Sequence, residues 1–208
     1  MSDVSIRCAR LTRREIAAVA RMHATEVPEG FLATLGEPVL RLLYEHAATS
    51  ELSRIFVAED ERGVPVGYIC GTLDTGALLK EFLRRRWHTA LPVIIPRLLS
   101  AKRIFRILET LRYSGTSEPG LPSAEIMNFV VVPAWRGHGV ATVLFDHLMR
   151  WFAAAGRTEI KIVTGEHQRR ARGFYEKSGS VPRGRTSIHR GTAARVYVYR
   201  SEGHDHAL

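Results

Sequence analysis

The chain has 208 residues, 45% of them hydrophobic, which suffices for one substantial core, so we expect a single domain over 1–208. Its 30 Lys and Arg against 21 Asp and Glu give a net charge of +9, which favours anionic partners: phosphorylated cofactors, nucleotide-linked substrates, nucleic acid or a membrane surface. Only Cys8 and Cys70 are present, without a disulfide framework or metal-ligand spacing, and neither a leader nor a membrane-spanning stretch is predicted, so we expect a cytoplasmic protein.

The first half of the chain predicts two helices between short strands. Thr12 is a helix-capping residue, and Pro38 fits the first turn of a second helix. The turn sequence from Asp60 to Gly63 is suited to a hairpin. In chain order we expect a strand over 4–10, helices over 12–26 and 31–48, and paired strands over 54–59 and 65–72.

The segment 75–122 departs from this alternation of helices and strands, and we expect it to be a basic helical insertion. Two amphipathic helical patterns, separated near Pro92 and Pro96, precede a connector over 114–122. Residues 77–113 hold nine basic side chains against two acidic ones. The insertion could clamp a phosphorylated acceptor, touch a membrane through Phe82 and Trp87, form a homodimer contact, or be a solvated helix face.

The second half again alternates strands and helices. We expect strands over 123–132, 158–163, 181–189 and 193–199, helices over 138–155 and 168–177, and a polar tail over 201–208. The tail contains His204-Asp205-His206, but no rigid scaffold fixes these side chains, so no metal site is predicted.

The most informative stretch is Arg136-Gly137-His138-Gly139-Val140-Ala141, at the start of a predicted helix. The first turn of a helix presents N–H groups without intrahelical partners, and the peptide dipoles add partial positive charge. Gly137 and Gly139 remove Cβ atoms that would obstruct phosphates, and they permit unusual backbone angles. The stretch therefore predicts a pyrophosphate site, although an isolated Gly-x-Gly is also typical of a tight loop into a helix.

Two motifs make this sequence similar to the GNAT superfamily of N-acetyltransferases. Arg136, Gly139 and Ala141 occupy the fixed positions of its signature Arg/Gln-x-x-Gly-x-Gly/Ala. The stretch from Gln168 to Ser180 resembles a second signature, Asn-x-x-Ala-x-x-x-Tyr-x-Lys-x-Gly-Phe, with Gln168 in place of Asn and Ser180 in place of Phe. The resemblance covers nearly the whole chain except 75–122. It implies an α/β (α+β) fold with a mixed, mostly antiparallel twisted sheet, flanked by helices and splayed near 129–132.

The resemblance also implies acetyl-CoA as co-substrate and the residues that bind it. The pyrophosphate loop is implied to comprise Arg136, Gly137, His138, Gly139, Val140, Ala141 and Thr142. The strand before it is implied to bind the pantetheine arm through the backbone of Phe129, Val130 and Val131. The second motif contributes Gln168, Ala171, Phe174 and Lys177.

The chemistry needs a proton acceptor, because an amine is mostly protonated at neutral pH and only its neutral form attacks a thioester. The resemblance implies Glu125, since some members carry a general-base glutamate at this place, and its apolar neighbours would strengthen it as a base by desolvation. A glutamate that faces solvent or pairs with an arginine is the alternative. Other candidate bases are His23, His46 and His167. Tyr175 matches the superfamily's proton donor to the departing sulfur, unless its ring only packs in the core.

The acceptor side is expected to comprise residues 31–44 and the insertion, with Phe31, Tyr44 and Arg84 as candidate substrate contacts. We favour the primary amine of a small molecule, with an amino sugar on a nucleotide carrier as the class that fits the basic insertion. Alternatives are a protein N-terminus or lysine as acceptor, and a non-catalytic acyl-CoA-binding regulator. Nucleic-acid binding is less favoured because no recognised motif accompanies the positive charge.

Overall fold

The computed structural model describes residues 5–7, 11–28, 33, 36–94, 120–187 and 193–201. The helices are α1 (Arg13–Glu26), α3 (Glu37–Ala47), α4 (Thr75–Ile94), α6 (Val140–Ala154) and α7 (Arg169–Lys177), with a short 3₁₀ helix η2 (Pro133–Trp135). The strands are β1 (Ser5–Arg7), β2 (Ser53–Glu59), β3 (Pro65–Thr72), β4 (Glu125–Val131), β5 (Glu159–Gly165), β6 (Val181–Ser187) and β7 (Ala193–Arg200). This order confirms the predicted α/β class.

The described strands form one twisted sheet in the order β1-β2-β3-β4-β5-β7-β6. Every neighbouring pair is antiparallel except β4 and β5, which run parallel, so the sheet is mixed and mostly antiparallel as expected. The β2–β3 hairpin turns where predicted, because the Asp60 carboxylate accepts from the amides of Arg62 and Val64, and Gly63 has a φ of 69°.

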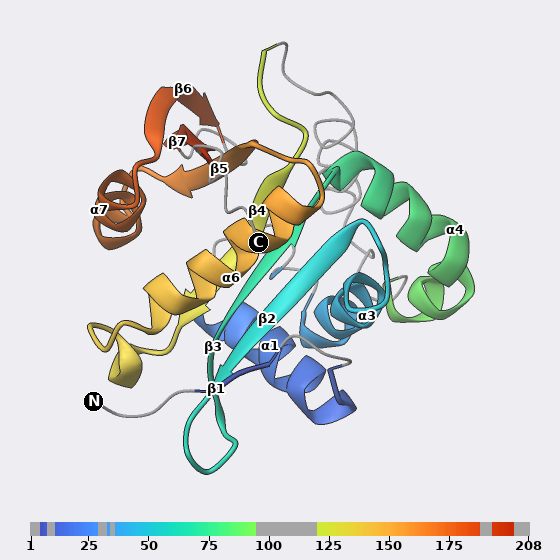
Figure 1. The fold of residues 1–208 in the computed structure, drawn as a ribbon. Coiled ribbons are helices and arrows are strands. Elements are labelled where there is room, and N and C mark those ends of the chain that lie inside the picture. The colour runs from blue at the N-terminus through green and yellow to red at the C-terminus, as the bar shows by residue number, and fades with distance from the viewer. Residues whose placement is uncertain are drawn as a thin grey trace.

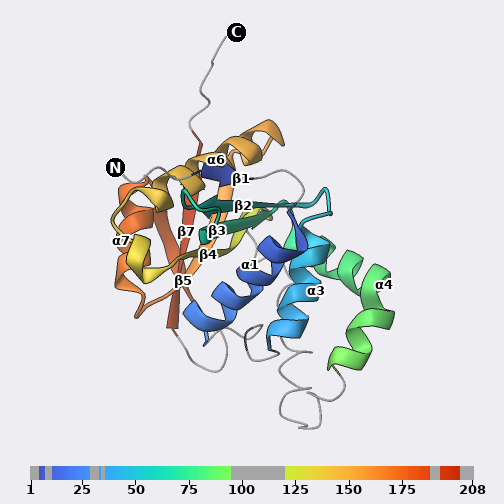
Figure 2. The same cartoon turned by 90° about the horizontal axis from the view of Figure 1, so that it is seen from below.

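Helices cover both faces of the sheet (Figures 1 and 2). The α6 face packs Phe56 and Ala58 of β2, whereas Ile55 and Val57 of the same strand pack on the other face with α1 and α3. This alternation is the period-two pattern of a strand covered on both sides. The core therefore has two halves, one on each face of the sheet.

The sheet opens between β4 and β5. The two strands pair only at Glu125 with Lys161 and at Ile126 with Ile162. Directly after these pairs the register between β3 and β4 shifts, because Cys70 pairs with Asn128 and Gly71 with Ile126. The extra residue, Met127, makes a β-bulge. The splay expected near 129–132 is thus present, and it begins right after Ile126.

Several predicted boundaries are corrected. Thr12 caps α1 as expected, in a capping box with Glu15. Within the second predicted helix, α3 begins at Glu37 with Pro38 in its first turn, whereas residues 31, 32, 34 and 35 lie outside the described residues. The expected break at Pro92 is wrong, since α4 runs through it to Ile94; helices accommodate a proline by bending. Residues 95–119 of the predicted insertion lie outside the described residues, as do 4 and 8–10 of the first predicted strand, 188 and 189 of the sixth, and 202–208 of the tail.

Candidate active site

The loop between η2 and α6 presents a row of backbone N–H groups. The first backbone bond of α6 runs from the Val143 amide to the Gly139 carbonyl, at 3.2 Å. Within the described chain, the amides of residues 137–142 have no backbone acceptor, and no side chain caps the helix. Gly137 and Gly139 have φ angles of 84° and 82°, which is why α6 begins at Val140 and not at His138 as predicted.

This loop has the chemistry that a diphosphate needs. A Cβ atom added at Gly137 or Gly139 would meet nothing within 4 Å, so the space in front of the amides is open. Residues 136–139 are exposed, and the helix dipole adds partial positive charge at the same place. The predicted pyrophosphate residues from Arg136 to Thr142 therefore lie together at one open helix start, and the residues present fit an acyl-CoA.

The Arg136 side chain links this loop to β4 and α1. Its Nε donates to the Val131 carbonyl at 2.9 Å, and its Nη2 lies 2.7 Å from Glu26 Oε2. The guanidinium thus ties the end of β4 to the last turn of α1. A contact of Arg136 with the cofactor stays a prediction.

The second motif forms α7, whose aromatic side chains reach back to the splayed strand. The ring of Phe174 lies 5.6 Å from that of Phe129 on β4 and 5.7 Å from that of Tyr175. The Gln168 side chain accepts from Thr164 Oγ1 at 2.8 Å. Ser180 is buried, and its hydroxyl has no partner among the described residues. Cofactor contacts of Gln168, Ala171, Phe174 and Lys177 stay predictions, as do those of Val130 and Val131.

Glu125 lies on the last paired stretch of β4, immediately before the splay. Its Oε2 is 2.7 Å from Lys161 Nζ, and its Oε1 accepts a short hydrogen bond from Thr75 Oγ1 at the start of α4. The side chain is 16% exposed. The alternative to a free base, an ion pair, is present, and the partner is a lysine of β5 rather than an arginine. The role of Glu125 as general base stays a prediction.

Tyr175 is buried among aromatic rings of the α6 face, including Phe145 and Tyr197. Burial raises the pKa of its phenol well above its usual value, so the group is protonated at neutral pH. Within the described chain its hydroxyl has no hydrogen-bond partner. It is therefore available as a proton donor, and its catalytic role stays a prediction.

The acceptor-side predictions are only partly placed. Phe31 lies outside the described residues. Tyr44 is a correction, because its side chain is 3% exposed and lies in the core, where its hydroxyl bonds His23 and Tyr68. It does not line an open surface. Arg84 lies exposed on α4, which packs against α3 through Phe82, Ala90 and Leu43.

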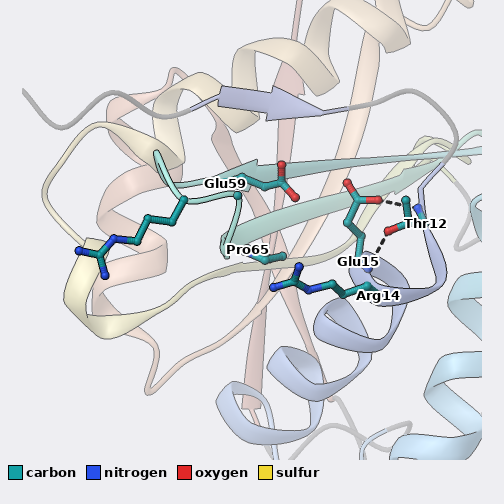
Figure 3. A pocket seen from close by; sticks show the side chains of 7 residues that line it. Thr12, Arg14, Glu15, Glu59 and Pro65 are labelled. Carbon is teal, nitrogen blue, oxygen red and sulfur yellow. Dashed lines mark hydrogen bonds between the residues drawn. The ribbon is translucent and has the colours of Figure 1, made fainter.

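Two hollows lie beside α1. One of about 450 Å³ lies between the start of α1 and the β2–β3 turn, with Glu15 and Glu59 turned toward it (Figure 3). It is two strands away from the splay. A second hollow of about 490 Å³ runs along α1 to Glu26 and Val132, next to the loop that Arg136 links to α1.

Residue patterns did not reveal three side chains at the splay, namely Asn128, Tyr68 and Lys161. Tyr68 Oη donates to Asn128 Oδ1 at 2.7 Å. The available signal was the single polar residue within the apolar run Ile126-Met127-Asn128-Phe129-Val130. The bulge that directs this residue could not be read from sequence.

β4 separates from its parallel neighbour at a bulge, and an open, glycine-rich helix start follows directly. This arrangement suits a long cofactor with a diphosphate. We expect the arm to lie in the opening and the diphosphate to bind the loop amides. Fold and site together define the class of acyl-CoA-dependent acyltransferases.

Comparison with known proteins agrees with this class. The model of the Acetyltransferase (GNAT) family matches residues 19–179, so the chain belongs to the GNAT family. It is therefore an N-acetyltransferase, and an acyl-CoA, typically acetyl-CoA, is the co-substrate that the family implies. No curated protein matches the chain.

Solved structures share the fold. A structure of SsHAT superposes with a TM-score of 0.66 and 18% identity, covering 95% of this chain and 98% of that one. A chimera of spermidine N-acetyltransferase SpeG from Vibrio cholerae and hSSAT gives a TM-score of 0.59 and 16% identity, covering 96% of each chain. A GNAT-family structure from Desulfovibrio desulfuricans gives 0.59 and 13%, covering 95% of this chain and 99% of that one. No helix among the described residues has the length and apolar character needed to cross a membrane.

Proposed function

We propose that this enzyme moves the acetyl group of acetyl-CoA to the primary amine of an anionic small molecule, such as an amino sugar on a nucleotide carrier. The observation that carries the proposal is the charge of α4 on the acceptor side. Lys80, Arg84 and Arg85 are exposed on this helix, and Glu81 is its single acidic residue. Glu81 pairs with Arg85 and with His46 of α3, so it faces inward to its own helix pair.

Transfer proceeds by direct attack. The neutral amine nitrogen forms a bond to the thioester carbonyl carbon, and the bond from that carbon to sulfur breaks as the tetrahedral intermediate collapses. Glu125 takes the amine proton, directly or through water, and its Oε2 lies 2.7 Å from Lys161 Nζ. Tyr175 gives its phenolic proton to the departing thiolate.

Other acceptors make different demands on α4. A polyamine is a cation, as in the spermidine N-acetyltransferases that share the fold, and the exposed arginines of α4 would repel it. A protein N-terminus or lysine would call for acidic residues near the opening. The cytoplasmic location and the homodimer stay predictions.

The acceptor is tested by following thiol release from acetyl-CoA with a nucleotide-linked amino sugar, spermidine, and peptides bearing a free N-terminus or a lysine. The anionic acceptor should give the highest kcat/KM, and its KM should rise with salt. Arg84→Gln should raise that KM severalfold, whereas Arg183→Gln, an exposed arginine of β6, should not. Glu125→Gln and Tyr175→Phe should each lower kcat about 100-fold, with acetyl-CoA affinity unchanged in calorimetry.

A higher kcat/KM for spermidine or for either peptide would refute the anionic acceptor. If both catalytic variants retain full turnover, the roles of Glu125 and Tyr175 are wrong. Acetyl-CoA binding without turnover of any amine would favour a non-catalytic regulator.

A further inference from the structure

A chain of buried polar side chains connects α1 to the splay. His23 Nδ1 lies 2.6 Å from Tyr44 Oη, Tyr44 Oη lies 3.0 Å from Tyr68 Oη, and Tyr68 Oη donates to Asn128 Oδ1 at 2.7 Å. The four residues come from α1, α3, β3 and β4. Sequence separations of 21, 24 and 60 residues are bridged by these three bonds.

This hydrogen-bonded chain is buried at its His23 end and partly exposed at its Asn128 end, beside the splay. The exposed fractions are 4% for His23, 3% for Tyr44 and 0% for Tyr68, whereas Asn128 is partly exposed. The surrounding cluster is otherwise apolar. Burying three polar side chains there costs free energy unless every group is bonded, so the arrangement holds together only as a set.

Donor counting gives the chain a single direction. The Asn128 carbonyl oxygen only accepts, so the one hydroxyl hydrogen of Tyr68 is used there. Tyr44 must then donate to Tyr68, and His23 must donate to Tyr44 from Nδ1. Burial lowers the pKa of His23 to about 4, so the ring is neutral at neutral pH. The donor count then places its one ring proton on Nδ1.

The β4 bulge orients Asn128, the last residue of this hydrogen-bonded chain. Because Met127 is the extra residue, Met127 packs on the α1–α3 face and Asn128 also bonds toward that face, while Phe129 returns to the α6 face. Asn128 is thus the second residue beyond the last β4–β5 pair, where the sheet has just opened. With Oδ1 oriented by Tyr68, the carboxamide presents its two N–H donors on the other side, where they can bond a ligand.

We propose that Asn128 donates a hydrogen bond to the thioester carbonyl oxygen of acetyl-CoA, and that Tyr68, Tyr44 and His23 are positioning residues that fix its carboxamide. The carbonyl oxygen gains negative charge as the nucleophile attacks, so a preoriented donor lowers the barrier. The inference rests on acetyl transfer at the splay, and it does not depend on which amine is the acceptor.

The test measures thiol release from acetyl-CoA with and without an amine, because attack by water draws on the same hydrogen bond. Asn128→Asp keeps the acceptor for Tyr68 and removes the donor, and it should lower kcat about 100-fold with little change in the KM for acetyl-CoA. Tyr68→Phe frees the carboxamide and should lower kcat about tenfold. The double variant should lose no more than Asn128→Asp alone, because Tyr68 acts through Asn128.

Ser53→Ala is the matched control. Ser53 is 2% exposed and its hydroxyl donates to the Ala47 carbonyl at 2.7 Å, between β2 and the end of α3. Its loss should lower stability as Tyr68→Phe does, without changing kcat. Equal kcat for Tyr68→Phe and Ser53→Ala, or a loss confined to KM, would overturn the proposal.

A spectroscopic measurement tests the direction of the chain without any turnover. The ¹⁵N shifts of His23 should show the proton on Nδ1 in the native enzyme, and Tyr44→Phe should abolish that pattern. A proton on Nε2 in the native enzyme would mean that the hydroxyls of Tyr44 and Tyr68 donate toward His23. Tyr68 would then not donate to Asn128 Oδ1, and the proposal would be refuted.

Discussion

Two glycines shape the helix start that we expect to bind the diphosphate. Gly137 and Gly139 adopt positive φ, and the space that a Cβ at either would enter is open. The motif could be found by sequence because glycine is the residue that tolerates this conformation. The exact start of α6 could not, since a sequence pattern does not show which of two glycines caps the helix.

Gly139→Ala should weaken acetyl-CoA binding about tenfold or more. The substitution places a methyl group where the phosphates approach, and the left-handed backbone costs roughly 1–2 kcal/mol of stability. Gly156→Ala is the control, because Gly156 has a φ of 70° at the other end of the same helix and is equally open. Both variants should unfold at similar urea concentrations, and only Gly139→Ala should raise the KM. A similar KM for the two variants would show that backbone strain, and not obstruction of the phosphates, causes the effect.

At the scale of elements, Arg136 links α1, β4 and the glycine loop. Arg136 joins Glu26 to the Val131 carbonyl, although they are 110 and 5 residues distant from it. Its side chain is 41% exposed, so the ion pair should contribute less than about 1 kcal/mol to unfolding. Its importance is therefore geometric.

Arg136→Ala should raise the KM for acetyl-CoA about fivefold to tenfold while changing the free energy of unfolding by less than about 1 kcal/mol. Glu26→Gln keeps an acceptor for the guanidinium and should raise the KM less. Arg200→Ala removes an ion pair of the same 2.7 Å length with Glu159, remote from the loop, and should leave the KM unchanged. If Arg200→Ala and Arg136→Ala behave alike, the link through Arg136 has no specific role.

Which elements could be predicted follows from where their signals lie. Thr12, Pro38 and the turn at Asp60 are local sequence signals, and the structure has a helix start, a first helical turn and a hairpin turn at these positions. The helix through Pro92 and the bulge at Met127 depend on tertiary context, which no local pattern contains. Lys161 as partner of Glu125 follows from the parallel pairing of β4 and β5, and that pairing is a property of the whole sheet.

At the scale of the whole molecule, the sheet separates two tasks. The α6 face carries Tyr175 and the aromatic rings that reach Phe129, and the α1–α3 face carries the hydrogen-bonded chain that ends at Asn128. Among the described residues, Phe129 of the α6 face and Asn128 of the α1–α3 face both lie at the splay. Proton donation to sulfur and binding of the carbonyl oxygen can therefore come from opposite sides of one thioester.

The burial of His23 should make the free energy of unfolding of the whole protein depend on pH. Burial lowers the pKa of His23 from 6.5 to about 4, so between these values the unfolded chain binds a proton that the folded protein excludes. The folded state should therefore be most stable above pH 6.5 and lose on the order of 3 kcal/mol as the pH falls to 4. Burial also lowers the pKa of His46, which acts in the same direction.

Urea unfolding at pH 7 and pH 4.5 measures this loss. His23→Gln keeps a donor for Tyr44 but cannot take up a proton, so the difference in unfolding free energy between the two pH values should shrink. His88→Gln, an exposed position on α4, should leave the difference as it is in the native protein. An undiminished difference in His23→Gln would mean that His23 is already protonated in the folded state, and a charged ring would draw the Tyr44 hydroxyl into a different set of bonds.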